Sequence, residues 1–98
     1  MGVRSRSSAG GAQFGLAVSS SVVTLTVPVA AFVAEITVRT AGVVFTRDGT
    51  DPTATKGTPA YVDDIILLNS REELEGFKVI RQGADATLDV EYFTDLSG

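Results

Sequence analysis

The stretch FVAEITVR, residues 32–39, has the clearest periodicity in the chain. A polar residue follows each of the apolar residues Ala34, Ile36 and Val38, which gives a period of two. Successive side chains of a β-strand point to opposite faces, so this alternation predicts a strand with one buried and one solvated face. The predicted buried face carries Phe32, Ala34, Ile36 and Val38, and the predicted solvated face carries Glu35, Thr37 and Arg39.

Further segments rich in β-branched and aromatic residues lie on both sides of this strand. Turn-forming residues separate them, and no helical period of useful length occurs. We therefore expect an all-β fold, an antiparallel β-sandwich or flattened barrel of six to seven strands with an extended N-terminal arm. The expected strand segments are residues 22–27, 32–39, 43–47, 60–62, 65–68, 77–81 and 87–93.

The links between these segments carry local structure signals. The sequences TAG at residues 40–42 and QGAD at residues 82–85 predict two hairpins, each joining the strands on either side. Residues 48–59 gather Gly, Pro, Asp and Thr, which predicts a surface loop. Ser70, followed three residues later by Glu73, forms a capping-box pattern that predicts about one helical turn.

The run IILL at residues 65–68 is apolar without interruption. Such a run is typical of a strand that is covered on both faces. We expect the opposite layer on one side and a neighbouring subunit on the other, and bare sheet edges also favour association. The chain is therefore expected to form a homo-oligomer.

Residues 1–19 differ in composition from the rest of the chain. They are rich in Gly, Ser and Ala, with Phe14 and Leu16 as isolated apolar residues. This composition predicts an N-terminal arm over residues 1–19, either flexible or ordered by a partner. The β-sandwich domain is expected to span residues 20–98.

The composition argues against catalysis. The chain contains no His and no Cys, which removes the commonest general base and both of the usual transition-metal ligands. Neither Lys56 nor Lys78 lies in a motif that would activate a serine. We expect no enzyme activity and no cofactor.

Four acidic residues suggest a cation site only weakly. Asp48, Asp51, Asp63 and Asp64 lack the ligand spacing and the bidentate Glu of an EF-hand loop. Ordinary turn chemistry, with Asp48 and Asp51 bonded to the backbone of their own loop, explains two of them. We therefore assign no metal.

Charge is unevenly distributed along the chain. Residues 1–31 carry only Arg4 and Arg6, whereas residues 32–98 carry six basic and twelve acidic residues. An acidic body disfavours contacts with phosphates, so no direct nucleic-acid partner is expected. No apolar run reaches the ~18 residues of a membrane span, so no membrane partner is expected either.

Adjacent residues on a strand face opposite ways, so either Tyr92 or Phe93 must leave the core side. That residue can anchor a subunit contact, as can apolar residues of the arm and of the first strand. The candidate interface residues are Phe14, Leu16, Val22, Val23, Leu25, Tyr92 and Phe93.

Four segments resemble small virion structural proteins of tailed bacteriophages. They are ITV at residues 36–38, FTRDGTDPTA at residues 45–54 with Gly57, FKVIR at residues 77–81, and ATLDVEYF at residues 86–93. Proteins of this kind often carry a loop of the form R-x-D-G-T-x-P-T-x-x-x-G and end in a-t-L-x-V-x-Y-F. The likeness covers roughly sixty residues, from Ala34 to Phe93, and departs from the loop spacing at Arg47 to Gly49.

The resemblance implies a capsid decoration or cement protein of the virion, assembled in the host cytoplasm. Its partner would be the major capsid protein or another virion protein, and it would bridge neighbouring capsid subunits. A neck, tail or head-fibre attachment protein is the alternative within the virion. A carbohydrate-binding β-sandwich module is the alternative of another class, and it would need a groove lined by exposed tyrosines such as Tyr61 and Tyr92.

Overall fold

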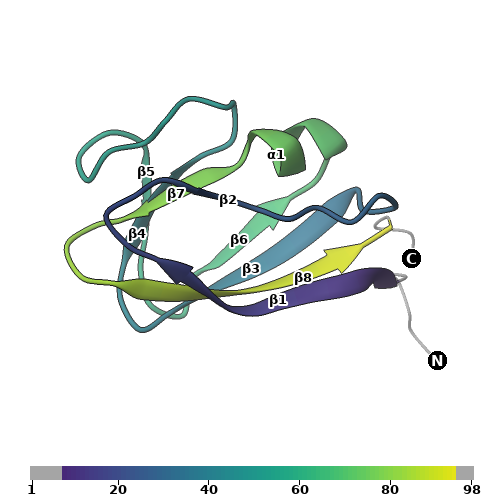
Figure 1. The fold of residues 1–98 in the computed structure, drawn as a ribbon, viewed down its shortest axis with the longest axis horizontal. Helices are drawn as coiled ribbons and strands as arrows, with labels where there is room; N and C mark the ends of the chain where they lie inside the picture. The colour runs from purple at the N-terminus through teal and green to yellow at the C-terminus, as the bar shows by residue number, and fades with distance from the viewer. Residues whose placement is uncertain (1–7, 95–98) are drawn as a thin grey trace.

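A computed structural model of the chain describes residues 8–94, which form eight β-strands and one short helix. Two antiparallel four-stranded sheets pack against each other (Figure 1), which confirms the predicted all-β sandwich. Sheet A contains, in spatial order, β1 (Ser8–Val18), β8 (Ala86–Phe93), β3 (Val33–Arg39) and β6 (Ile65–Leu68). Sheet B contains, in spatial order, β2 (Val23–Thr24), β7 (Lys78–Arg81), β4 (Val43–Thr46) and β5 (Thr58–Ala60).

The alternation that predicted β3 also explains its place inside sheet A. Ala34, Ile36 and Val38 are fully buried, and the polar residues between them lie on the outer face of the sheet. β3 pairs with β8 on one side and β6 on the other. Phe32, predicted to share the buried face, is instead 51% exposed because it lies just before the paired region begins.

Side chains from both sheets interlock in one core. Burial of each large apolar side chain contributes roughly 1.5–3 kcal/mol, so this core is the main source of stability. Its largest fully buried members are Val18, Ile36, Val38, Val43, Leu68, Leu74, Phe77, Val79, Leu88 and Val90, together with Tyr92.

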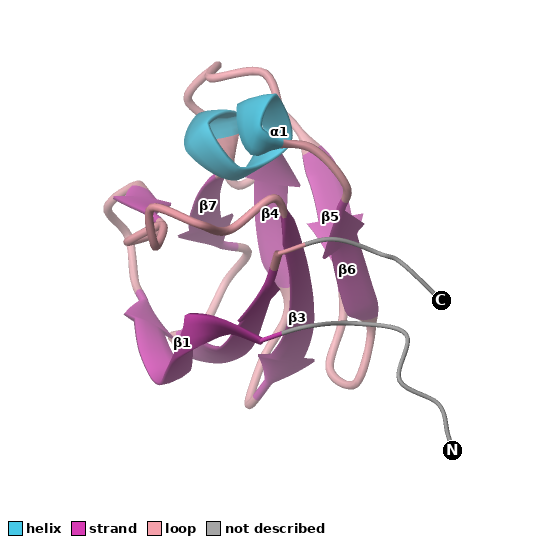
Figure 2. Cartoon of the chain, turned by 90° about the vertical axis from the view of Figure 1, so that its right-hand side faces the viewer, coloured by secondary structure: helices cyan, strands magenta, loops and turns pink. Residues whose placement is uncertain are grey.

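The helix α1 (Arg71–Gly76) lies at one end of the sandwich, between β6 and β7 (Figure 2). The Ser70 hydroxyl accepts a hydrogen bond from the Glu73 amide, and the Glu73 carboxylate accepts one from the Asn69 amide, at 2.8 Å. The first bond satisfies a backbone donor that the first turn leaves open, as the capping-box pattern predicted, and the second ties Glu73 to the residue before the cap. Leu74 and the following Phe77 enter the core, and the Phe77 ring stacks on Phe45 at 5.6 Å. No helix among residues 8–94 is long and apolar enough to cross a membrane.

The prediction of an N-terminal arm is wrong for residues 8–18. Residues 8–18 form β1, which pairs with β8 inside the sandwich, so the domain begins well before residue 20. Two register shifts interrupt the pairing, and Gly15 adopts φ 72° at the second of them. These bulges break the period of two, which is why the segment reads as irregular. Residues 1–7 lie outside the described residues.

Both predicted hairpins are also wrong. β3 lies in sheet A and β4 in sheet B, so the link at residues 40–42 crosses between the sheets. The link at residues 82–85 does the same between β7 and β8. A short turn-forming segment indicates that the chain reverses direction. It does not distinguish a hairpin within one sheet from an arch that connects two sheets.

The predicted loop at residues 48–59 folds back over the outer face of sheet B. Pro52 is buried there, and the Asp51 carboxylate accepts a hydrogen bond from the Lys78 ammonium at 2.8 Å. Gly57 adopts φ 131°, and a Cβ at this position would lie only 2.7 Å from Cγ1 of Val44. Glycine is therefore required where the loop crosses β4 and returns as β5.

One polar side chain, that of Gln13, joins three segments of the chain. The Tyr92 hydroxyl on β8 donates a hydrogen bond to Oε1 of Gln13 on β1. The same oxygen accepts the Thr26 amide at 3.0 Å, beyond the end of β2. Gln13 thus joins the first strand, the last strand and the segment that leads from β2 to β3.

We predict that Tyr92→Phe lowers the free energy of unfolding by about 1 kcal/mol at neutral pH, because Gln13 loses one of its two donors. Burial raises the pKa of Tyr92 from 10.0 to about 12. The folded state therefore holds the phenol proton more tightly, and stability from this group is lost as pH rises from about 10 to 12.

Urea unfolding across this pH range measures both effects. Tyr92→Phe should lose less stability than the wild type above pH 10, whereas Tyr61→Phe, on an exposed ring, should follow the wild type. Equal pH profiles for all three proteins would show that Tyr92 is not linked to folding in this way.

Candidate functional site

The seven candidate interface residues separate into two groups. Phe14 is 68% exposed on β1, and Phe93 is half-buried at the end of β8. Of the others, Leu16, Val23 and Leu25 pack against the core and Tyr92 is buried, whereas Val22 is half-buried. Tyr92 and Phe93 therefore do face opposite ways, but only Phe93 can meet a partner.

Three apolar residues belong to segments that meet at the end of the molecule where the described chain begins and ends. Ser8 pairs with Phe93, and the Phe93 carbonyl accepts the Phe32 amide at 3.0 Å (Figure 1). Val29 lies three residues before Phe32 and is 91% exposed. We call Val29, Phe32 and Phe93 the terminal patch.

Arg71 on α1 holds the segment that carries Val29. Its Nη1 donates to the carbonyls of Pro28 at 2.7 Å and Ala31 at 2.9 Å, and to that of Val29 at 3.3 Å. Its Nε donates to the Glu75 carboxylate at 2.9 Å. Charge-assisted bonds to several carbonyls fix this turn, so Val29 is presented on an ordered support.

A second exposed apolar region follows the edge strand β6. Ile66 and Leu68 enter the core, whereas Ile65 is 59% and Leu67 40% exposed on the outer face. The prediction that the opposite layer covers one face of this strand is confirmed. The other face is open in the single chain, and the predicted neighbouring subunit remains a prediction.

Three of the four acidic residues considered as cation ligands have hydrogen-bond or ion-pair partners within the protein. Oδ1 of Asp48 accepts the Thr50 amide at 3.0 Å, which holds the pKa of Asp48 below its usual value. Asp51 pairs with Lys78, not with its own loop as predicted. Oδ2 of Asp64 accepts the Tyr61 amide at 2.8 Å. Within residues 8–94, no three acidic side chains gather in a way that would hold a metal ion.

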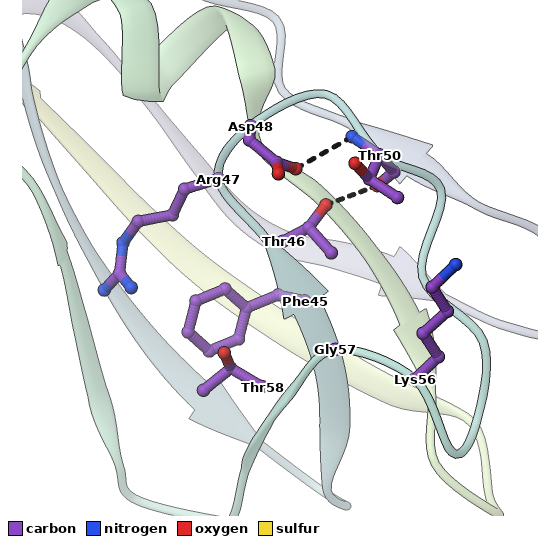
Figure 3. Close-up of a pocket in the computed structure, with 8 residues that line it drawn as sticks. All are labelled: Phe45, Thr46, Arg47, Asp48, Thr50, Lys56, Gly57 and Thr58. Atoms are coloured by element: carbon purple, nitrogen blue, oxygen red, sulfur yellow. Dashed lines mark hydrogen bonds between the residues drawn. The ribbon is translucent and has the colours of Figure 1, made fainter.

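An open depression of about 550 Å³ lies between the end of β4 and this loop (Figure 3). Arg47 and Lys56 stand on opposite sides of it, with the Phe45 ring between them. The Arg47 guanidinium lies 5.0 Å from the centre of that ring and donates to the Leu67 carbonyl at 3.4 Å. Arg47 therefore bridges the two sheets across the open side of the sandwich.

The two tyrosines lie in different environments. Tyr61 borders a smaller depression of about 300 Å³ beside Pro59 and Gln82, whereas Tyr92 is buried. A groove with both rings on its surface, as a carbohydrate-binding module would use, is not formed by these residues.

Sequence reasoning missed Val29, Phe32 and Arg71 as members of a common site. Val29 follows Pro28 in an irregular segment, where an exposed apolar residue has no periodic signal. Arg71 directly follows the predicted cap at Ser70, and nothing in the local sequence indicates its bonds to residues 28–31. Ile65 and Leu67 did have a signal, because an uninterrupted apolar run at a sheet edge leaves one face for a partner.

Comparison of the chain with protein families and curated proteins, and of its structure with solved structures, finds no match.

We predict that Arg71→Ala lowers the free energy of unfolding by about 2 kcal/mol, because three carbonyl groups lose a charged donor. Arg71→Lys should recover only part of this loss, since an ammonium cannot reproduce the planar fork. Arg39→Ala is the matched control: its guanidinium meets only Asp89, at 3.4 Å and exposed, so the change should cost less than about 1 kcal/mol. Urea unfolding measures all three, and equal losses for Arg71→Ala and Arg39→Ala would contradict the assignment.

We also expect calcium to leave the melting temperature unchanged. The carboxylates of Asp48 and Asp51 already bind Thr50 and Lys78, so a cation would have to displace those partners. A ligand that binds only the folded state raises its stability with concentration. Thermal melts in calcium and in chelator should coincide, and a rise of several degrees in calcium would reveal a cation site.

Proposed function

We propose that the chain is a structural protein of a bacteriophage virion, a capsid decoration or cement protein that binds the head shell through the terminal patch. The observation that carries this proposal is the patch itself. Val29 and Phe32 lie three residues apart, and the Phe32 amide bonds to the carbonyl of Phe93 from the other end of the sequence, so all three exposed or half-buried residues lie at one end of the sandwich. Apolar side chains on an ordered support are typical anchors of protein interfaces.

The segments that resemble phage virion proteins build the scaffold behind this patch. Gly57 and Pro52 fit the loop against sheet B, and the ATLDVEYF segment forms β8 with Leu88 and Val90 in the core. These residues are the ones that a shared fold would retain. They support the fold implied by the resemblance, and the patch supports the role.

Stabilisation by mass action would be the mechanism. A protein that binds only the assembled shell adds its binding free energy to the stability of the shell. Many repeated contacts, each of a few kcal/mol, add up over a particle. The role depends on shape and on apolar contact, and it needs no reacting group.

The acidic body suits the outside of such a particle. Residues 32–98 carry six more acidic than basic residues. Like charge on the exposed surface keeps particles apart in solution. The end that carries the terminal patch would face the shell, and the remainder of the domain would face solvent.

We predict that Val29→Ser combined with Phe32→Ser weakens binding to shells of the major capsid protein encoded with the chain. Each lost apolar anchor should reduce affinity roughly tenfold or more. Tyr61→Ser is the matched control, because Tyr61 is similarly exposed but adjoins the far end of β3, where the amide of Asp63 donates to Val38. Co-sedimentation with purified shells, after a thermal melt has shown that each variant is folded, makes the comparison.

Equal binding by the wild type and the double variant would contradict a role for the terminal patch. The copy number on purified particles separates the two virion alternatives. A decoration protein should be present in a fixed ratio to the shell subunits over the whole head, whereas a neck or fibre attachment protein should be present as a single ring or at isolated positions. Absence from particles would refute both.

A further inference from the structure

The backbone of β6 is paired on one side only. Val38 of β3 accepts a hydrogen bond from the Asp63 amide at 2.8 Å and donates one to the Asp64 carbonyl at 3.0 Å. Backbone groups alternate in direction along an antiparallel strand, so Ile66 and Leu68 also bond to β3, two and four residues further on. The N–H and C=O groups of Ile65 and Leu67 therefore point away from the sheet.

The outward groups of Ile65 and Leu67 belong to an apolar edge. β6 is the last strand of sheet A, and among residues 8–94 it pairs with no strand other than β3. On its outer edge, Arg47 donates to the Leu67 carbonyl at 3.4 Å. Edge strands of soluble proteins are usually short, charged or bulged; β6 is short, with four residues, but it consists of Ile and Leu only and carries no charge that would disfavour pairing.

We propose that β6 pairs with β6 of a second copy of this chain, antiparallel, about a two-fold axis at Ile66. Ile65 then lies opposite Leu67 of the second copy, and Leu67 lies opposite its Ile65. Both residues direct their backbone groups outward, so both pairs exchange N–H···O=C hydrogen bonds. The two sheets A join into one continuous sheet.

The side chains of this pairing match. On the outer face, Ile65 and Leu67 of each copy pack against those of the other, which covers the side chains that a single chain leaves exposed. On the inner face, Ile66 meets Ile66 of the second copy, and the two cores become continuous at this edge. The pairing explains why all four residues of β6 are apolar although every second one, Ile65 and Leu67, is exposed in the single chain.

The charges at the ends of β6 are complementary in the same register. Asp64 lies opposite Leu68 of the second copy and Asp63 opposite its Asn69, so no acidic residue meets another. Arg47 lies beside Leu67, and the strand of the second copy continues from Ile65 into Asp64 and Asp63. The guanidinium of Arg47 can turn from the Leu67 carbonyl to these carboxylates, which makes the contact favourable at both ends of the two-fold pair.

This pairing goes beyond the proposed function and does not depend on it. The terminal patch adjoins the start of β3, whereas the β6 edge lies on the opposite side of sheet A from β1. The pairing uses residues of β6 that are not part of the patch, and a monomer could still bind a shell. The experiment below uses the isolated chain, so its failure would leave the proposed function intact.

Sedimentation equilibrium of the full chain over a range of concentrations tests the proposal. The mass should rise from 10.2 kDa toward twice that value. Leu67→Lys and Ile65→Lys should each remain at the monomer mass, because a charge would be placed in the apolar pairing. Phe14→Lys is the matched control: Phe14 is equally apolar and more exposed, but it lies on β1, so this variant should dimerise as the wild type does.

Removal of Arg47 supplies a second readout. Arg47→Met should weaken the dimer about two- to fivefold, since it removes a contact with the acidic residues of the second copy. A stronger dimer in this variant would show that Arg47 shields the edge from association, and it would overturn the proposal in its charge-paired form. A wild-type chain that stays monomeric up to about 1 mM, or a dimer unaffected by both lysine variants, would overturn the pairing itself.

Discussion

The pairing of β8 with both β1 and β3 is the constraint on which the rest of the structure depends. β8 is the last strand of the chain, yet it lies between the first strand and the third. Its core-facing residues Leu88, Val90 and Tyr92 are all buried, and Tyr92 reaches Gln13 on β1. Sheet A therefore cannot close until nearly the whole chain is available, and such long-range pairing makes folding slow and highly cooperative. It also brings Ser8 and Phe93 together, which forms the end that carries the terminal patch.

The sequence predicted correctly those elements whose structure is determined by residues close together in the chain. The alternation from Ala34 to Arg39 specified a strand with one buried face, and Ser70 with Glu73 specified the start of α1. β1 could not be found in this way, because its bulges and its Gly and Ala residues leave no regular period. The two hairpin predictions were wrong for another reason. A turn residue such as Thr40, at φ 77°, reverses the chain but does not determine which strand the following segment will pair with.

The candidate site shows the same division. The alternation of side chains along a strand correctly predicted that Tyr92 and Phe93 face opposite ways. Which of the two is buried could be decided only from the packed core, in which Tyr92 lies. Among the candidates from the first strands, Leu16, Val23 and Leu25 are apolar because they pack against the core, whereas Phe14 is exposed. Val29 can be identified as a candidate interface residue only from the structure, in which Arg71, more than forty positions later, binds the turn that carries it. The local sequence gives no indication of a contact between residues so far apart in the chain.

The central claim is that this domain acts by docking the end that carries Val29 and Phe32 onto a larger shell. Cryo-electron microscopy of native particles at side-chain resolution tests it most directly. The account predicts density for the sandwich on the outer surface of the head, with Val29 and Phe32 buried against the shell and the acidic body turned to solvent. Particles without this domain, or a domain attached with that end exposed, would contradict it.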